Sequence, residues 1–504
     1  MVEKIEIVKG SEALKVLSQR EKIEITNSSE AFEALPKSLN LHAETPTQIG
    51  VLKDYFSVFT PTNSIDGSNT IDFKIPSSLN TVIDPSKTLM RFKFKILKGN
   101  EIICERQRKQ FDFQGRDMRT WEPRMDHMVI PVNNIVQAMW SNVMVKINDQ
   151  ILSTGDSVYP YRADIETKMM TSEQGKKNLL PGGWLEEKIP WDSIKTTEHN
   201  PAKVQTNPAD PNMQLNSHNA LQYRYDRIHH KEDNSERGVW FVQGPIHSEI
   251  FKSKKVLPPG TLLNVIFTKN DPKFCLLSDE AINYKIQIED FELVVHLMEV
   301  DPDIVNEMLL HTQRKAFVYP IRKVDLRWIT IGKERTSINE VNLLPEKSKL
   351  PRRLFICFVD QKAFNQPGSF SKDPFHYHHL DIKKTILRVG NTARPYPSIY
   401  YRWYFYPQIP DHMFALQHTT NTIFSSYFIG YNPRDISTRN FIIPYKLAPT
   451  ESKPGECYEM LPSENIHFNA VLGKPTDKVY QMIIYAEYDA ELTINEHGKI
   501  NLSS

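Results

Sequence analysis

The sequence is poor in cysteine, and its few cysteines are far apart. Four occur in 504 residues, at Cys104, Cys275, Cys357 and Cys457. None forms a CxxC pair, the spacing typical of structural zinc sites and redox motifs. We therefore interpret all four as free, neutral thiols of a protein that resides in a reducing compartment.

An excess of charge and long apolar runs are missing as well. The 62 lysines and arginines almost cancel the 61 aspartates and glutamates, so no overall basic field attracts nucleic acid or an anionic membrane. The N-terminus has no apolar signal core, and no run approaches the ~18 apolar residues of a transmembrane span. We expect synthesis in the cytosol or nucleus and no membrane span.

Glycine is scarce relative to proline, with 19 glycines against 33 prolines. Many short strands separated by rigid turns fit that ratio better than disorder does. A chain of 504 residues is too long for one ordinary hydrophobic core, so its length indicates two domains of about 200 residues or more.

Residues 1–45 form a predicted N-terminal arm. One weak amphipathic turn, Ser11 to Leu17, precedes a polar stretch, and acidic residues slightly outnumber basic ones. The arm therefore differs from the basic arms that condense RNA. We interpret it as a terminus that is flexible or clamped by a partner.

Alternation with a period of two follows the arm. Apolar and polar residues alternate in Ile71–Ile75, Met90–Ile96 and Val143–Ile147, and two further strands are predicted at Leu262–Thr268 and Tyr284–Ile288. No helical crossovers of about 10–15 residues separate these strands, which favours antiparallel sandwiches over an α/β sheet.

The alternation stops between about residues 171 and 238. This segment is polar and rich in proline, asparagine, histidine and lysine. We predict a long outward insertion between two strands. Its aromatic residues indicate that part of it packs: Trp184, Trp191, Tyr223 and Tyr225.

The clearest predicted helix opens at Asp301. Asp301 can cap the helix, Pro302 suits its first position, and Asp303 favours the positive end of the helix dipole. Strand character returns at Ala316–Ile331. The helix therefore connects two β-domains.

The second half repeats the style of the first, with strands predicted at Leu354–Val359, Ile386–Val389 and 485–494. The predicted organisation is all-β: a sandwich at 46–300 with its insertion at about 171–238, a linker helix at 301–315, and a second sandwich at 316–504.

Catalytic signatures are missing: there is no P-loop, GxGxxG, HExxH or GxSxG motif. The densest candidate cluster is His376, His378 and His379, because imidazoles bind transition metals and alternation places His376 and His378 on one face. No cysteine or acidic residue stands at zinc-like spacing, although Asp373 and Asp381 are near, so we favour a polar loop. The pair His229 and His230 in the insertion is a weaker candidate.

Paired carboxylates are a second candidate: Asp301 with Asp303, and Glu487, Asp489 and Glu491. On a strand the last three share one face, which we expect to face solvent. A catalytic pair requires environments that separate two pKa values, and nothing here indicates a buried pocket. We therefore interpret them as hydrated surface charges.

The tract from Tyr396 to Tyr406 is unusually aromatic. It could stack on carbohydrate or single-stranded bases, or form a protein–protein contact. Because the chain has no net basic charge, we favour core packing or a subunit interface. The sequence therefore predicts no catalytic, cofactor-binding or metal-ligating residues and no enzymatic activity.

A family resemblance is carried by Phe274–Ile331, with FCLL, YKIQI, an aliphatic strand, a helix and YPIRKV in that order. Asp54–Val58 followed by Thr60-Pro61-Thr62, and YAEYDAEL near the end, extend it over about residues 50–496. In these segments the chain resembles the major capsid proteins of Polinton/Maverick elements and adintoviruses.

The resemblance implies an all-β double jelly roll, with two consecutive jelly-roll sandwiches joined by the helix. It implies homotrimers that form pseudo-hexagonal capsomers of an icosahedral shell. The shell would enclose double-stranded DNA without sequence-specific binding, alongside penton and minor capsid proteins. The protein would reside in the virion, after assembly in the host cytoplasm or nucleus.

Two alternatives stay open at this stage. The aromatic tract and the histidine cluster also suit a carbohydrate-binding or cupin-like β-sandwich module. A scaffold encoded by a host or a transposon, with the same fold and no shell assembly, fits as well.

Overall fold

The computed structural model describes part of the chain, which divides into two compact units, Met1–Val51 and Leu52–Ser504. The described residues are 14–17, 22–25, 50–102, 106–111, 117–122, 129–153, 158–186, 217–229, 238–278, 283–346, 348–364, 368–403, 407–422, 429–450 and 461–503.

In the first unit, β1 (Leu14–Leu17) and β2 (Lys22–Ile25) pair as an antiparallel hairpin. The predicted amphipathic turn is therefore wrong over Leu14–Leu17. The two segments contain Val16, Ile23 and Ile25, and β-branched residues favour strands.

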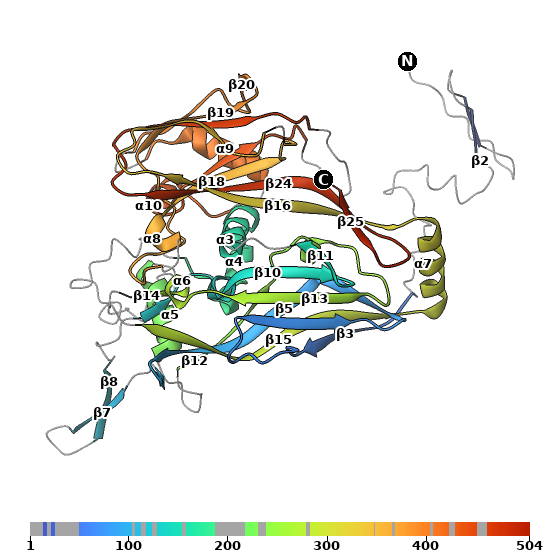
Figure 1. Ribbon diagram of the computed structural model, residues 1–504, viewed down its shortest axis with the longest axis horizontal. Helices are drawn as coiled ribbons and strands as arrows, with labels where there is room; N and C mark the ends of the chain where they lie inside the picture. Colours follow the sequence, from blue (N-terminus) through green and yellow to red (C-terminus); the bar gives the residue numbers. More distant parts are fainter. Residues whose placement is uncertain are drawn as a thin grey trace. The chain divides into compact units, whose positions relative to one another are not determined.

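Two sheets form the first jelly roll, at the bottom of Figure 1. One sheet has the order β12 (Val239–Pro245), β5 (Thr81–Lys98), β15 (Tyr284–Val300) and β3 (Val51–Phe59). The other has the order β11 (Gln150–Ser153), β10 (Trp140–Ile147), β13 (Leu262–Lys269) and β4 (Thr70–Pro76).

The second jelly roll, coloured from yellow through orange to red in the upper part of Figure 1, also has two sheets. One has the order β16 (Phe317–Ile331), β24 (Tyr480–Ile494), β18 (Arg353–Asp360) and β22 (Ile442–Lys446). The other has the order β17 (Ser337–Asn342), β23 (Ile466–Leu472), β19 (Ile382–Val389) and β20 (Thr392–Ala393).

The strand order is the same in the two jelly rolls. When the eight principal strands described for each are numbered along the chain, one sheet reads one-eight-three-six and the other two-seven-four-five. Strands distant in sequence are thus neighbours in space, as in the jelly-roll arrangement of two Greek keys. We name the sheets the 1-8-3-6 sheet and the 2-7-4-5 sheet below.

Short elements complete the described structure. The strands are β6 (Glu101–Ile102), β7 (Arg106–Phe111), β8 (Asp117–Glu122), β9 (Val129–Pro131), β14 (Leu276–Ser278), β21 (Ile399–Tyr400) and β25 (Ile500–Ser503). The helices are α2 (Ile135–Ala138), α3 (Tyr159–Met170), α4 (Glu173–Lys177), η2 (Leu180–Gly182), α5 (Ser217–His229), η6 (Ile250–Lys252), α6 (Pro272–Cys275), α7 (Pro302–Arg314), α8 (Gln361–Phe364), α9 (Pro410–Thr420) and α10 (Pro433–Thr438).

The alternation read from the sequence matches the burial of the strands. In β4, Ile71, Phe73 and Ile75 are fully buried while the residues between them are more exposed. Aromatic rings meet edge to face in this core, with Phe92 and Trp140 at 5.4 Å between ring centroids. The predicted strands of both halves are confirmed.

A tight turn joins β10 to β11. Asn148 and Asp149 both have positive φ angles, 48° and 62°. Two consecutive positive φ angles are typical of the two-residue turns that suit the twist of a hairpin. The dipeptide Asn148-Asp149 suits this turn, because asparagine and aspartate tolerate positive φ angles.

The predicted helix is confirmed as α7, which joins the last strand of the first jelly roll to the first strand of the second. The side-chain carboxylate of Asp301 accepts a hydrogen bond from the backbone N–H of Asp303 (2.9 Å), so Asp301 caps the helix as expected.

The connection from β11 to β12 begins differently from the prediction. α3 occupies residues ahead of the predicted insertion, and α4, η2 and α5 lie within it. Trp184 and Tyr225 are buried, so part of the insertion packs, as predicted, whereas Trp191 lies outside the described residues. Among the helices that the structure describes, none is both long and apolar enough to cross a membrane.

Candidate functional site: the polar network between the two jelly rolls

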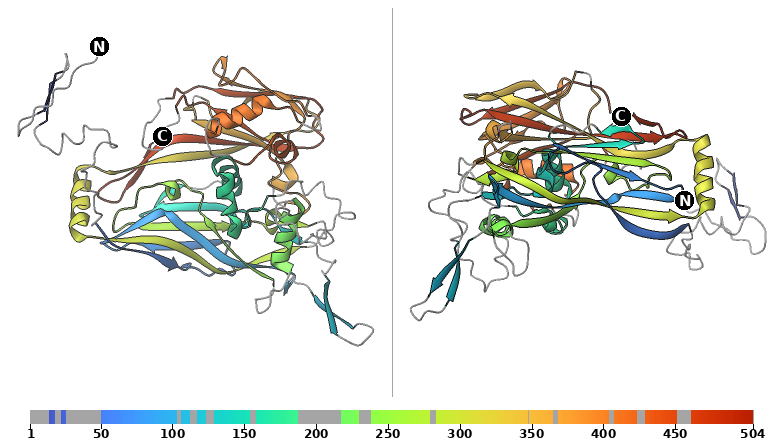
Figure 2. Two further views of the ribbon diagram at one scale, coloured as in Figure 1. Left: turned by 180° about the vertical axis from the view of Figure 1, so that it is seen from behind. Right: turned by 60° about the horizontal axis from the view of Figure 1, so that its bottom comes forward.

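Helix α3 is the centre of the contact between the two jelly rolls. It packs on β10 of the first jelly roll, and Figure 1 and the left view of Figure 2 show it between the two sets of sheets. Residues Tyr159 to Met169 are all buried, including seven charged or hydroxyl side chains. A helix buried on every side must find partners for each polar group that it carries.

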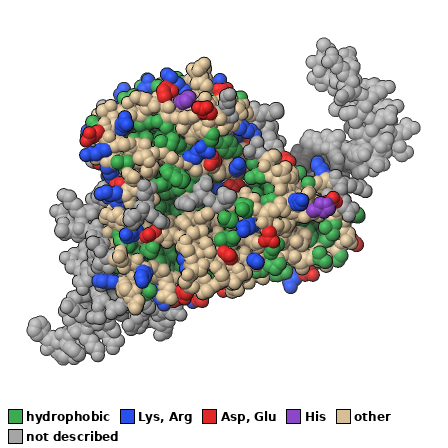
Figure 3. Space-filling model, in the orientation of Figure 1, with side chains coloured by type: hydrophobic (Ala, Val, Ile, Leu, Met, Phe, Trp, Pro, Cys, Tyr) green, Lys and Arg blue, Asp and Glu red, His purple; other side chains and the backbone are tan. Residues whose placement is uncertain are grey.

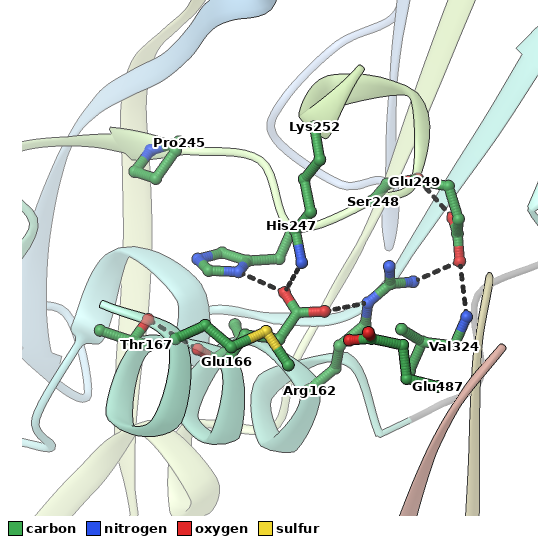
Figure 4. Close-up of polar contacts among 12 residues, drawn as sticks. Arg162, Glu166, Thr167, Pro245, His247, Ser248, Glu249, Lys252, Val324 and Glu487 are labelled. Carbon is green, nitrogen blue, oxygen red and sulfur yellow. Dashed lines mark hydrogen bonds and ion pairs between the residues drawn. The ribbon is translucent and has the colours of Figure 1, made fainter. Parts of the chain in front are cut away.

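Glu166 of α3 is the hub of this network (Figure 4). Its carboxylate contacts Arg162 Nε at 3.1 Å, His247 Nδ1 at 2.7 Å and Lys252 Nζ at 2.5 Å. The hydroxyl of Tyr485, on β24 of the second jelly roll, donates a fourth hydrogen bond at 3.1 Å. One carboxylate therefore joins the two jelly rolls.

The protonation states follow from this environment. Burial opposes the ionisation of Glu166, but Lys252, Arg162 and His247 outweigh burial and hold the pKa of its carboxyl well below its usual range. Burial lowers the pKa of His247 despite the neighbouring carboxylate. Because an ionised Glu166 can only accept, a neutral His247 donates its Nδ1–H to it.

Arg162 extends the network toward the second jelly roll. Its Nη1 lies 2.8 Å from Glu249, and the Glu249 carboxylate also accepts a 3.5 Å hydrogen bond from the backbone N–H of Val324 on β16. Burial would lower the pKa of Arg162, but the carboxylates of Glu249 and Glu166 raise it, so the guanidinium stays charged.

The facing side of the second jelly roll carries matching charges. Glu487 on β24 accepts two 3.0 Å hydrogen bonds from Arg353 on β18. Asp489 lies 2.8 Å from both Arg322 and Arg352. Bidentate arginine–carboxylate pairs of this kind combine strength with fixed geometry.

This burial corrects the prediction of hydrated surface charges for Glu487 and Asp489, whereas Glu491 is half-buried. Glu487 is 3% exposed and Asp489 is 6% exposed. Alternation correctly places them on one face of β24, but the first jelly roll covers that face and arginines neutralise the carboxylates. The period of a strand identifies two faces and does not say what lies against the outer one.

A second buried polar cluster is formed by Asp164 and Lys168 of α3. Lys168 and Asp164, both fully buried, pair at 2.9 Å, and the Tyr377 hydroxyl donates to Asp164 at 2.6 Å. Burial raises the pKa of the Asp164 carboxyl against the opposing effect of Lys168. The ammonium of Lys168 also lies 4.4 Å from the centre of the Tyr377 ring. This cluster ties α3 to the loop before β19.

Lys176 of α4 adds a third link. Its ammonium donates to the carbonyls of Lys168 (2.9 Å) and Ile429 (2.7 Å) and lies over the ring of Tyr431. Burial lowers the pKa of Lys176 to about 8. Together the three groups of contacts fix the two jelly rolls at one mutual orientation, because a buried polar network tolerates few arrangements.

The histidine cluster does not converge on one point. The rings of His376 and His378 lie 3.9 Å apart between centroids, so these two are together as expected. His379 instead stacks on Trp403 at 4.3 Å, and its Nδ1 accepts from the N–H of Asp381. Burial lowers the pKa of His378 to about 2. No group of three potential metal ligands was found within the described ranges.

The aromatic tract is divided between core and surface. Tyr401 is buried, and the Trp403 indole N–H donates to the carbonyl of Ile382 at 2.6 Å. Tyr400, by contrast, is 53% exposed. Residues 404–406 lie outside the described part. The alternative as a carbohydrate-stacking platform is not favoured, because the rings do not share one exposed face.

The remaining candidate residues have structural positions. Asp301 and Asp303 belong to the cap of α7. The side chain of His229 and all of His230 lie outside the described residues. Cys275 and Cys357 are buried free thiols whose pKa values burial raises, as predicted. Cys104 and Cys457 fall in segments that are not described.

Sequence reasoning missed α3, and with it the network. A helix buried on all sides shows no apolar stripe, so the usual amphipathic pattern is missing. Two signals were available: Pro160 at the start, and the pairs Arg162–Glu166 and Asp164–Lys168 at the i,i+4 spacing of helical ion pairs.

Comparisons with known proteins agree with this architecture. No protein-family model matches the chain. An uncharacterized protein of Caenorhabditis elegans, F54H12.2, is 24% identical over 375 residues, which is 71% of this chain and 78% of that protein.

Among solved structures, a chain of the Sputnik virophage superposes with a TM-score of 0.56 and 12% identity, covering 93% of this chain and 92% of the other. The mavirus major capsid protein gives a TM-score of 0.49 with 11% identity, and 97% of each chain is covered. With the strand order described above, the likeness to the Sputnik chain establishes the fold: the protein is an all-β double jelly roll.

Proposed function

We propose that this chain is the major capsid protein of an icosahedral double-stranded DNA virus or virus-like element, with a structural and non-enzymatic role. The observation that carries the proposal is the pairing of two jelly rolls with one strand order inside a single compact unit. Three such chains supply six similar blocks, which is what a pseudo-hexagonal capsomer needs. The likeness to a virophage chain supports the same conclusion.

The buried network suits this role. A capsomer must keep its two jelly rolls at one angle, and three groups of buried polar contacts around α3 would hold that angle. The charge of the chain suits it as well. Acidic and basic side chains intermingle on the face drawn in Figure 3, as expected of a container that encloses DNA without coating each phosphate.

Polinton/Maverick elements and adintoviruses are our proposed origin. The segments around YKIQI and YPIRKV support it. On this proposal residues 1–45 are an arm, 46–300 and 316–504 are the two jelly rolls, and 301–315 link them. The partners would be further copies, penton proteins and minor capsid proteins, in a virion assembled in the host cytoplasm or nucleus.

Native mass spectrometry with negative-stain microscopy of the full-length protein tests the proposal. We expect a stable trimer and pseudo-hexagonal particles or sheets. A well-folded protein that stays monomeric at high concentration would contradict it. Trimers that form no particle or sheet across salt and pH would favour a scaffold instead. Glycan-array binding lost on changing exposed Tyr400 to Ala would favour the carbohydrate-binding alternative.

A further inference from the structure

The outer faces of the two 1-8-3-6 sheets carry the same ion pair at the same place. In the second jelly roll, Arg353 on the third strand is directly opposite Glu487 on the eighth. In the first, Arg91 on the third strand is directly opposite Glu292 on the eighth, 2.6 Å apart. The two faces are therefore topologically and chemically equivalent.

Their surroundings differ. The second face is covered by α3 of the first jelly roll. The first face remains exposed, with Leu52 at 58%, Phe56 at 57% and Phe241 at 52% exposure. These side chains point outward, since the residues that alternate with Phe56 and Phe241, such as Tyr55 and Trp240, pack into the core.

Apolar side chains therefore lie at both edges of the first face, on β3 and β12, with the Arg91–Glu292 pair between them. An exposed apolar patch rimmed by charges is typical of a protein–protein contact. In the second jelly roll, the outer face of the 1-8-3-6 sheet is covered by the other jelly roll of the same chain.

The covering element also has a counterpart. α3 lies in the connection between the fifth and sixth strands of the first jelly roll. In the second jelly roll that connection contains α9, where Phe414 is 52% exposed, close after the exposed Tyr400. The exposed rings of Tyr400 and Phe414 can therefore contact another molecule. They lie in the connection between the fifth and sixth strands, and in the first jelly roll the same connection contains α3, the helix that covers the facing sheet.

The geometry points to a contact between copies that repeats the contact within the chain. The outer face of β12, β5, β15 and β3 binds the second jelly roll of a neighbouring copy, through the connection that carries Tyr400 and Phe414. This inference rests on the proposed capsid function. The two surfaces differ, so the contact is heterologous, and it closes into a ring of three chains if each jelly roll turns by one sixth of a circle relative to the previous one.

Site-specific photo-crosslinking of the full-length protein tests the contact directly. Phe56 is replaced by p-benzoylphenylalanine, the trimer is irradiated, and crosslinked peptides are identified by mass spectrometry. We expect intermolecular crosslinks to peptides spanning residues 396–420. Crosslinks to a different segment of the partner, or no intermolecular crosslink in a trimer, would overturn the inference.

Charge substitutions provide a second test. Phe56→Glu and Phe414→Glu should each raise the concentration at which half of the trimer dissociates by at least about 30-fold, the effect of losing one interface hot spot. Leu79→Glu is the matched control, because Leu79 is 76% exposed in the loop between β4 and β5. Melting followed by circular dichroism should show that each variant folds.

The outcomes separate the two proposals. If the unmodified protein is monomeric, the capsid function fails and this inference fails with it. If it is a trimer that neither Phe56→Glu nor Phe414→Glu weakens more than Leu79→Glu does, the capsid function stands and only the assigned interface is wrong.

Discussion

The outer faces of the two 1-8-3-6 sheets place an arginine and a glutamate at the same strand positions in different environments. Arg353 and Glu487 lie against a buried helix, with side chains 25% and 3% exposed, whereas Arg91 and Glu292 are 32% and 30% exposed, so the two pairs differ mainly in the burial of the glutamate. Local strand geometry creates both pairs. The contribution of each pair to stability depends on its solvent exposure, because water screens the attraction between the two charges.

The difference has an expected size. Removing one partner of a buried pair leaves an uncompensated charge and costs about 3–5 kcal/mol. An exposed pair contributes about 0.2–1 kcal/mol, because water and salt screen it. Substitutions in the two pairs, a pH series and a salt series test this contrast.

Glu487→Ala should lower the free energy of unfolding by about 3 kcal/mol, the low end of the range for a buried pair, because Glu487 is buried but Arg353, which loses both hydrogen bonds, is 25% exposed. Glu292→Ala at the equivalent position should cost less than about 1 kcal/mol in the monomer. Urea unfolding followed by circular dichroism measures both. Equal effects of the two substitutions would contradict the proposed difference in burial.

Lys168→Met should destabilise the protein by about 3 kcal/mol, because Asp164 loses its partner in a fully buried site. Adding Asp164→Asn should restore at least half of that loss, since the amide oxygen can still accept from Tyr377. The free energies of unfolding of both single variants and the double variant form the required cycle. Strict additivity would show that the pair is not coupled.

Two histidines with lowered pKa values extend the comparison to pH. His247 has Glu166 as a partner, whereas neither ring nitrogen of His412 has a hydrogen-bond partner among the described residues. Burial lowers the pKa of His412 to about 3. As the pH falls below about 6.5, the ordinary pKa of histidine, His412 is protonated in the unfolded chain but stays neutral in the folded chain.

Stability should consequently fall by about 1.4 kcal/mol per pH unit for this one histidine between pH 6 and 4. His412→Phe should remove that slope and be neutral or stabilising at pH 7, because no hydrogen bond is lost. Urea unfolding at several pH values measures the slope. A slope as steep in His412→Phe as in the unmodified protein would refute the assignment.

The smallest effect concerns salt. Raising NaCl from 0.05 to 1 M should weaken the exposed pairs Arg91–Glu292, Lys93–Asp290 and Lys95–Glu289 by less than about 1 kcal/mol in total. The difference between unmodified protein and Glu292→Ala should shrink accordingly. The penalty of Glu487→Ala should change less with salt, since the Glu487 carboxylate is only 3% exposed and Arg353 is 25% exposed.

Much of the fold could be predicted from the sequence, because strands with one buried face alternate visibly. The alternation of Ile71, Phe73 and Ile75 is visible in the sequence, and Asp301-Pro302-Asp303 predicts the start of α7. The candidate site could not be predicted in the same way. Helix α3 is buried on all sides, so it has no apolar stripe, and Glu487 looks like an ordinary surface residue of a strand.

The local periods, the turn at Asn148 and Asp149, the cap of α7 and the absence of a dominant charge all follow from the amino-acid sequence. These features depend on neighbours along the chain. Long-range packing, in contrast, sets which outer face is covered, which carboxylates are buried, and that Glu166 joins the two jelly rolls. Such properties depend on residues hundreds of positions apart, as Glu166 and Tyr485 are, and no local pattern encodes them.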